Sequence, residues 1–100
     1  MTYRRFVFGI LIATLLTGTA FALDGKKYLK EASVKPAAAR AAALKAYPGK
    51  IVSEELEKES GGSGLRYSFV ISQNAAKHEV GIDAKTGAVL ENSVEGKNPD

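Results

Sequence analysis

The chain has 100 residues, of which 45% are hydrophobic and 25% charged, and its formal net charge at pH 7 is +3. This length supports one domain with a thin core. Cysteine is absent, which excludes disulfide bonds and a lipid-anchor cysteine. We infer no nucleic-acid partner from so small a net charge.

Residues 1–22 have the pattern of a secretory signal peptide. Arg4 and Arg5 precede an apolar run, Phe6–Leu16, and Ala-Phe-Ala at 20–22 supplies the small residues of a cleavage site. We expect cleavage after Ala22, which would lower the net charge by two and leave no stable membrane insertion. The alternative is an uncleaved anchor, for which the apolar stretch is short. The pattern predicts export, to the periplasm in preference to the extracellular medium.

A helix is predicted at the start of the mature domain. Residues 23–32 are polar and lysine-rich and are interpreted as a flexible lead. Ser33 is the expected N-cap, Pro36 suits the first turn, and Pro48-Gly49 ends the helix after Tyr47. The predicted inner face of the helix consists of Ala37, Ala41, Leu44 and Tyr47. Arg40 is expected to lay its aliphatic stem along this face and to keep its charge in water.

Alternating patterns predict a meander of antiparallel strands after the helix, at 51–59, 65–72, 77–84 and 88–93. In the first strand one face holds Val52, Glu54, Leu56 and Lys58, and the other holds Ile51, Ser53, Glu55, Glu57 and Glu59. In the second strand the side chains expected to face the helix are Leu65, Tyr67, Phe69 and Ile71. In the third strand a shared face holds His78, Val80 and Ile82.

The connections are predicted from their turn residues. Ser60–Gly64 is expected to form a flexible hairpin loop, and Asn74 lies in the next turn. In the last hairpin the side chain of Asp83 can accept from backbone amides two residues on, and Gly87 can take a positive φ. The whole is an α+β domain over 33–93, with one helix on a sheet of three or four antiparallel strands and a polar tail at 94–100.

The chain has few residues suited to catalysis. His78 is the only histidine, and Glu79 points to the opposite face of a strand, so neither a zinc site nor an acid–base pair is expected. No serine lies in a nucleophile elbow. The glycine cluster at 61–64 lacks the Gly-Lys-Ser/Thr ending of a phosphate loop. We therefore expect no enzyme, no metal and no cofactor.

Two charged or polar surfaces each have two interpretations. The glutamates at 54, 55, 57 and 59 could hold Ca²⁺ or meet a basic partner, or they could be a solvated strand that resists edge pairing. The face of the sheet turned away from the helix could be a recognition surface or an ordinary solvated face. Its candidate binding residues are Arg66, Ser68, Val70, Glu79 and Asp83, beside Ser72 and Gly81.

The order of these elements resembles that of the PepSY domain family. The resemblance is carried by Pro48-Gly49-Lys50 after the helix, Tyr67 in the second strand, and Val80 to Asp83 followed by Lys85-Thr86-Gly87 in the last hairpin. It implies a structural role for Pro48, Gly49, Tyr67, Asp83, Thr86 and Gly87, and it offers no catalytic residue to transfer.

The resemblance also implies a function. PepSY-like modules control peptidases without covalent chemistry, so the expected partner is a protein, and a peptidase in particular. No peptidase domain follows in this sequence, which argues against inhibition in cis. The alternative function is a periplasmic domain that binds a small ligand or metal ion as a sensor.

Overall fold

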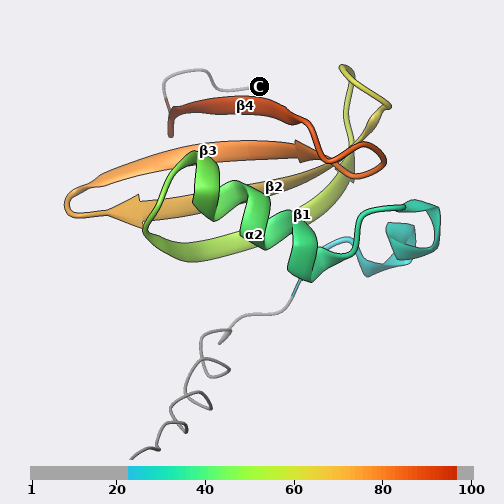
Figure 1. Ribbon diagram of the computed structural model, residues 1–100, viewed down its shortest axis with the longest axis horizontal. Coiled ribbons are helices and arrows are strands. Elements are labelled where there is room, and N and C mark those ends of the chain that lie inside the picture. Colours follow the sequence, from blue (N-terminus) through green and yellow to red (C-terminus); the bar gives the residue numbers. More distant parts are fainter. Residues whose placement is uncertain (1–22, 97–100) are drawn as a thin grey trace, which may run out of the picture.

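A four-stranded antiparallel sheet carries one α-helix on one of its faces (Figure 1). The computed structural model describes residues 23–96, so the predicted signal peptide lies outside the described residues. The elements are the 3-10 helix η2 (Lys26–Glu31), the helix α2 (Pro36–Ala46), and the strands β1 (Lys50–Lys58), β2 (Leu65–Gln73), β3 (Ala76–Asp83) and β4 (Val89–Val94). The sheet order is β1-β2-β3-β4. The predicted α+β fold class is confirmed.

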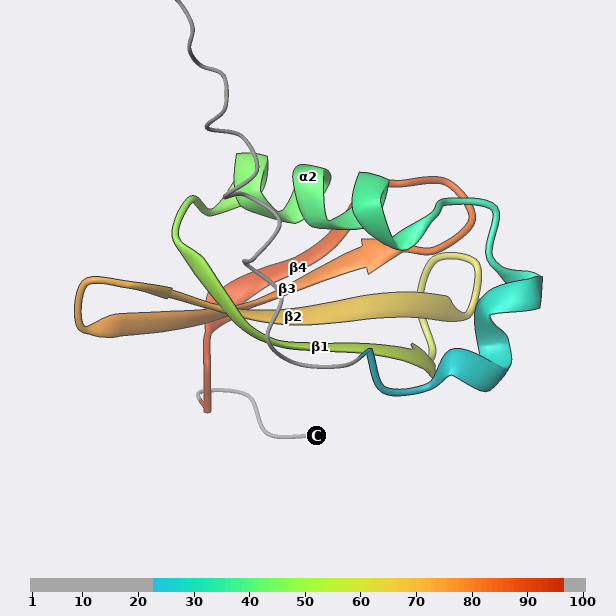
Figure 2. The same cartoon turned by 90° about the horizontal axis from the view of Figure 1, so that it is seen from below.

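The core lies between α2 and the sheet. Tyr67, Phe69 and Ile71 of β2 are buried beneath α2, together with Val80 and Ile82 of β3, as their alternation predicted. Such burial is the main favourable term in folding. The described helices leave the other face of the sheet uncovered (Figure 2). This asymmetry defines where an outside molecule can reach the sheet.

The predicted start of the helix is wrong. Lys35 occupies the N-cap position and makes no side-chain cap, while Pro36 begins the first turn as expected. Ser33 instead donates its backbone N–H to the carbonyl of Ala84 at 2.9 Å, and Val34 donates to the same oxygen at 2.9 Å. Pairing with the last hairpin, rather than a hydroxyl cap, therefore fixes where α2 begins.

The predicted inner face of α2 is confirmed for Leu44 and Tyr47, which pack against the core, and wrong for Ala37 and Ala41. Ala39 and Ala43 are fully buried, whereas Ala37 and Ala41 are exposed. An alanine-rich helix has little difference between its faces, so the sequence pattern could not set its rotation. The contacts before α2 and the ion pair described below determine which alanines meet the sheet.

A β-bulge changes the pattern at the start of β1. The register with β2 shifts between Ile51 and Ser53, so Ile51 packs against the core and Val52 is 37% exposed. Simple alternation predicted the opposite orientations for Ile51 and Val52. The bulge reverses them, because it places an extra residue on one strand. Beyond the bulge Leu56 is buried as predicted.

The segment before α2 is more ordered than a flexible lead. Asp24 forms a parallel bridge with Glu55 of β1. Its N–H donates to the carbonyl of Glu54 at 3.2 Å, and its carbonyl accepts from the N–H of Leu56 at 2.8 Å. The η2 helix follows, and Lys58 pairs with Glu31 at 2.7 Å. Part of the outer edge of β1 is thereby occupied by the chain itself.

Candidate functional site

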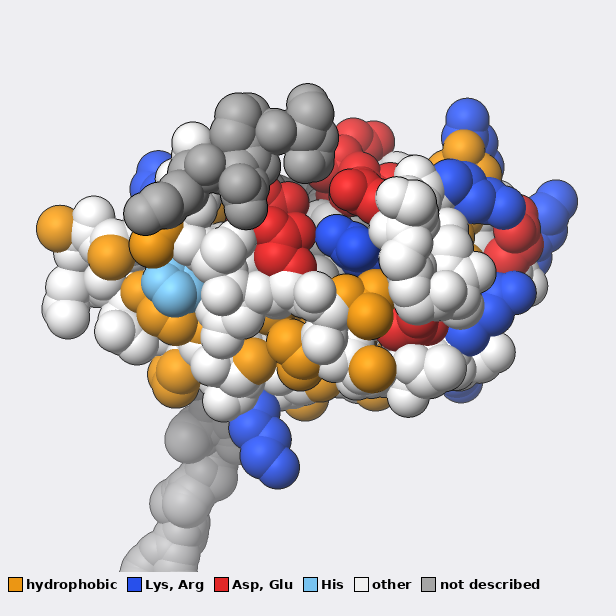
Figure 3. All heavy atoms as spheres, turned by 90° about the horizontal axis from the view of Figure 1, so that it is seen from above, with side chains coloured by type: hydrophobic (Ala, Val, Ile, Leu, Met, Phe, Trp, Pro, Cys, Tyr) orange, Lys and Arg blue, Asp and Glu red, His pale blue; other side chains and the backbone are white. Residues whose placement is uncertain are grey.

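The face of the sheet opposite α2 is the candidate site, and we call it the open face. The strand registers place on it Glu55 and Glu57 of β1, Arg66, Ser68, Val70 and Ser72 of β2, Lys77, Glu79 and Gly81 of β3, and Glu91 and Ser93 of β4. Figure 3 looks onto the β4 edge beside this face, where acidic side chains border a basic one.

Arg66 lies at the end of the open face beside the first hairpin loop, with its stem over Gly81 of β3. A Cβ atom on Gly81 would stand 3.0 Å from Cδ of Arg66 and 3.4 Å from its Nε, so the absence of a side chain at Gly81 makes room for the arginine stem. Only 12% of the Arg66 side chain is exposed, although it sits on an uncovered face. Its Nε is buried and has no hydrogen-bond partner among residues 23–96.

The guanidinium of Arg66 joins β2 to β4 and to the first hairpin loop. Its Nη1 lies 3.3 Å from Oε1 of Glu91 and 3.8 Å from Oε2 of Glu59, and its Nη2 donates to the carbonyl of Ser60 at 3.3 Å. Ser93 donates its hydroxyl to the other oxygen of Glu91 at 3.0 Å. The arginine is thus held in one orientation by groups from β4 and from the connection that follows β1.

A second polar pair lies beside this cluster. Ser68 is buried and donates its hydroxyl to Oε2 of Glu57 at 2.8 Å. The half-buried Val70 stands next along β2, opposite Glu79 of β3. Of the predicted binding residues, the structure therefore brings Arg66, Ser68, Val70 and Glu79 onto one surface. Their neighbours are Glu57, from the predicted acidic run, and Glu91, which the sequence did not indicate.

Asp83 does not belong to this surface. It is only 1% exposed and accepts four hydrogen bonds, from the N–H and hydroxyl of Ser63 at 2.7 and 2.8 Å, from the N–H of Lys85 at 2.8 Å and from the N–H of Thr86 at 3.1 Å. Burial alone would raise the pKa of Asp83, but the donors from Ser63, Lys85 and Thr86 outweigh it and hold the pKa well below its ordinary value.

The predicted turn role of Asp83 is found in this geometry, and Gly87 has the expected positive φ of 83°. The bonds to Ser63 were not foreseen. They tie the loop at 60–64 to the last hairpin, so this loop is anchored where the sequence predicted flexibility. Nothing in the glycine-rich sequence indicated that Ser63 would meet Asp83, which lies in another hairpin.

The acidic run of β1 divides between the two faces. Glu54 is buried on the helix side, where both of its oxygens accept from Arg40, at 2.8 Å from Nε and 3.2 Å from Nη2. The hydrogen bond with Glu54 raises the pKa of Arg40. The expectation that Arg40 keeps its charge in water is therefore wrong. Glu55 is exposed, and Glu57 pairs with Ser68.

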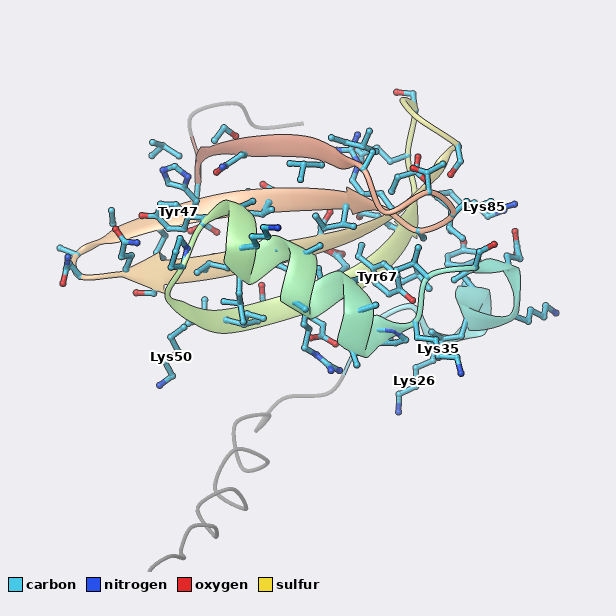
Figure 4. All side chains as sticks on the ribbon, viewed as in Figure 1. Lys26, Lys35, Tyr47, Lys50, Tyr67 and Lys85 are labelled. Atoms are coloured by element: carbon cyan, nitrogen blue, oxygen red, sulfur yellow. The ribbon has the colours of Figure 1, made fainter. Side chains whose placement is uncertain are left out.

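His78 lies at the margin of the sheet, on the helix side. Its ring stacks on that of Tyr47 with centroids 3.8 Å apart and planes 4° apart, and its Nδ1 is 2.7 Å from Oδ1 of Asn92 (Figure 4 shows Tyr47 at this end). Asn92 in turn donates to the carbonyl of Ala46 at 3.3 Å. This group fastens the end of α2 to β3 and β4, which is a structural role.

Two kinds of feature are absent from the described residues, 23–96. These residues contain no group of three or more histidine, cysteine, aspartate or glutamate side chains placed to hold a metal ion. None of their helices has the length and apolar character needed to span a membrane.

The arrangement defines a small α+β module with a structured polar face and no catalytic constellation among its described residues. A family model described as PepSY, peptidase propeptide and YPEB domain, matches residues 34–92. The chain belongs to this family, whose members are propeptide-like regulatory modules. Comparison with curated proteins and with solved structures gave no significant match.

The residues on which the resemblance was based have contacts that position the elements. The carbonyl of Pro48 accepts from Nε2 of Gln73 at 2.7 Å. A Cβ on Gly49 would lie 2.3 Å from the carbonyl oxygen of Ser72, so the turn after α2 passes close to β2. The hydroxyl of Tyr67 donates to the carbonyl of Val34 at 2.7 Å, beneath the start of α2 (Figure 4).

Proposed function

We propose that this protein is an exported, non-catalytic binding module that regulates a peptidase of the cell envelope by contact through its open face. The periplasm is its proposed location. Membership of the peptidase-propeptide family supports the class of partner. The observation that carries the proposal is the fixed orientation of Arg66 on a face that no described element covers.

A side chain held in place before binding suits recognition. Binding costs about 0.5–1.5 kcal/mol for each flexible side chain that it immobilises. Arg66 is already held by Glu91 and the carbonyl of Ser60, so a partner would order it at little further cost. Its neighbour Val70 adds a half-buried apolar group next to the charged cluster. Arginine is one of the residue types that most often contribute strongly to protein interfaces.

The small-ligand and metal-sensor alternative has no observation in its favour. The space between the carboxylates of Glu59 and Glu91, where a cation would be attracted, holds the guanidinium of Arg66. Both carboxylates therefore already share a cationic partner from within the chain.

The proposal is tested by measuring proteolysis of fluorescently labelled casein by an envelope extract of the producing organism while the purified protein is titrated in. We expect a dose-dependent fall in the casein-degrading rate. Val70→Arg, which puts bulk and charge on the open face, should abolish the effect. Ala41→Arg, which puts the same side chain on the exposed face of α2, should keep it.

The protein should contain no peptidase activity of its own in the same assay without extract. An unchanged casein-degrading rate at every concentration of a folded protein would contradict the proposed function. Equal losses of inhibition in the two arginine variants would contradict the assignment to the open face.

A further inference from the structure

The two edges of the sheet differ in how they are protected. β1 carries charges of both signs, a bulge at Ile51/Ser53, and the bridge from Asp24 along its outer side. Bulges, edge charges and covering segments are the devices by which natural sheets prevent unwanted pairing. β4 has the sequence Val-Leu-Glu-Asn-Ser-Val, with Glu91 as its only charge. It contains neither lysine nor proline.

The backbone of β4 presents bonding groups outward. The N–H of Glu95 donates to the carbonyl of Lys77, which makes this a hydrogen-bonded pair at the end of the β3–β4 ladder. Residues along an antiparallel pair alternate between bonded and non-bonded positions. The peptide groups of Val94 and Asn92 are therefore directed away from β3, toward the outer edge. Among the described residues, no backbone hydrogen bond reaches this edge from another element.

The side chains of this edge also differ between its two sides. Of the three exposed large hydrophobic residues in the described part of the chain, Val89 and Val94 belong to β4, and each is 50% exposed. On the open face the edge shows Glu91 and Ser93, with Glu79 behind Ser93 on β3. Glu95 follows β4 directly and is exposed. The edge thus combines an aliphatic side with an acidic side.

We propose that the outer edge of β4 is a docking site for an extended segment of a partner protein, which adds to the sheet as a fifth strand. Main-chain hydrogen bonds to Asn92 and Val94 would supply affinity, and side chains at alternate positions would supply selectivity. A segment in which lysine or arginine alternates with aliphatic residues fits both sides. Its basic residues would lie beside Glu91 and Glu95, and its aliphatic residues beside Val94.

This inference rests on the proposed function, since it specifies how a regulated partner is held. The two can nevertheless fail separately. If the peptide pairs with β4 but the protein does not affect casein proteolysis, the docking site on β4 stands and the proposed regulation of a peptidase is contradicted. If the protein still inhibits proteolysis when the β4 edge is altered so that no strand can pair with it, the regulation of a peptidase stands and the docking site on β4 is contradicted.

The probe is a fluorescein-labelled peptide, Lys-Val-Lys-Val-Lys-Val with blocked ends, and its charge-inverted counterpart with glutamate in place of lysine. Binding to the purified exported protein is followed by fluorescence anisotropy, and the pairing is located by amide hydrogen exchange. We expect saturable binding of the lysine peptide only, weaker at high salt, with slower exchange of the N–H groups of Asn92 and Val94.

Val94→Pro removes one outward N–H and leaves the β3 ladder intact, because proline is tolerated where an edge N–H faces solvent. It should weaken binding by about tenfold. Should this variant prove unfolded, the double variant Val89→Lys/Val94→Lys, which places repelling charges along the edge, gives the same test. Val52→Lys is the matched control on the β1 edge and should bind like the unmodified protein.

Equal binding of the two peptides, or unchanged exchange at Asn92 and Val94, would overturn the proposal. Protection of the same two amides that grows with protein concentration in the absence of peptide would also overturn it, because a second copy of the chain would then be the occupant of the edge.

Discussion

Arg40 of α2 and Glu54 of β1 form a two-point ion pair across the boundary between the helix and the sheet. The two bonds measure 2.8 and 3.2 Å, and the glutamate is buried while the arginine is partly exposed. Glu54 stands on the core side of β1, so its charge depends on Arg40 for a partner. The pair fixes both the rotation of α2 and its distance from β1.

Arg40→Met should therefore destabilise the protein. It leaves the carboxylate of Glu54 buried without its partner, at a cost of about 2–4 kcal/mol in the free energy of unfolding. Lys45→Met, which removes an exposed cation from the same helix, should cost much less. Urea unfolding measures both. Similar losses in the two variants would show that the ion pair contributes nothing specific.

Asp83 should make the stability depend on acidic pH. Its folded-state pKa is depressed, so its contribution is complete above the unfolded-state pKa of about 3.9 and is lost as the pH falls toward the folded value. Asp83→Asn should be less stable at pH 6 by about 2 kcal/mol, since it loses charge-assisted bonds. The stability gap between the variant and the unmodified protein should shrink below pH 4. A gap that stays constant down to pH 2.5 would contradict this account.

Tyr67 should make the stability of the fold depend on alkaline pH. Burial raises the pKa of its phenol, with the charge of Glu54 adding to the effect. The neutral form is thus favoured in the fold, and its contribution is present below the ordinary pKa of about 10 and lost above it. Tyr67→Phe removes the bond to Val34 and should cost about 1 kcal/mol at pH 8. The stability difference between the two proteins should narrow at pH 11, and a difference that widens would refute the assignment.

Gly49 should tolerate substitution worse than Gly64. A Cβ on Gly49 would approach the Ser72 carbonyl oxygen to 2.3 Å and Cγ2 of Ile71 to 2.9 Å, whereas a Cβ on Gly64 would meet nothing within 4 Å. Gly49→Ala should therefore lower the midpoint of thermal unfolding more than Gly64→Ala, since backbone on β2 must move to accept it. Equal midpoints would show that the turn after α2 can shift freely.

The sheet could be predicted from the sequence because apolar and polar residues alternate clearly along its strands. In β2 an alternation of apolar and polar residues predicted both the strand and its buried face, and both predictions are confirmed. The apolar residues are Leu65, Tyr67 and Phe69, and the polar ones are Arg66 and Ser68. Asn74 has the left-handed backbone, φ 56°, that suits its predicted turn. Where side chains differ clearly in polarity with period two, local pattern and final packing agree.

The sequence was insufficient where the structure depends on distant pairs. The rotation of α2 follows from Arg40 meeting Glu54, 14 positions along the chain, and an alanine-rich pattern carries no trace of it. Asp83 is covered by the 60–64 loop, in which Ser63, 20 positions earlier in the chain, supplies two of its donors. The same reason removes Asp83 from the candidate binding surface and leaves Arg66, Ser68, Val70 and Glu79 as its proposed members.

The most direct test of the account is site-specific photocrosslinking in the exporting cells. A benzoylphenylalanine is introduced at Val70 on the open face or, as the control, at Ala41 on the exposed face of α2. We predict a crosslinked product between the protein and a peptidase, identified by mass spectrometry, from position 70 and none from position 41. A folded protein that crosslinks no peptidase from position 70, or that crosslinks it only from position 41, would contradict the claim that the open face binds a peptidase.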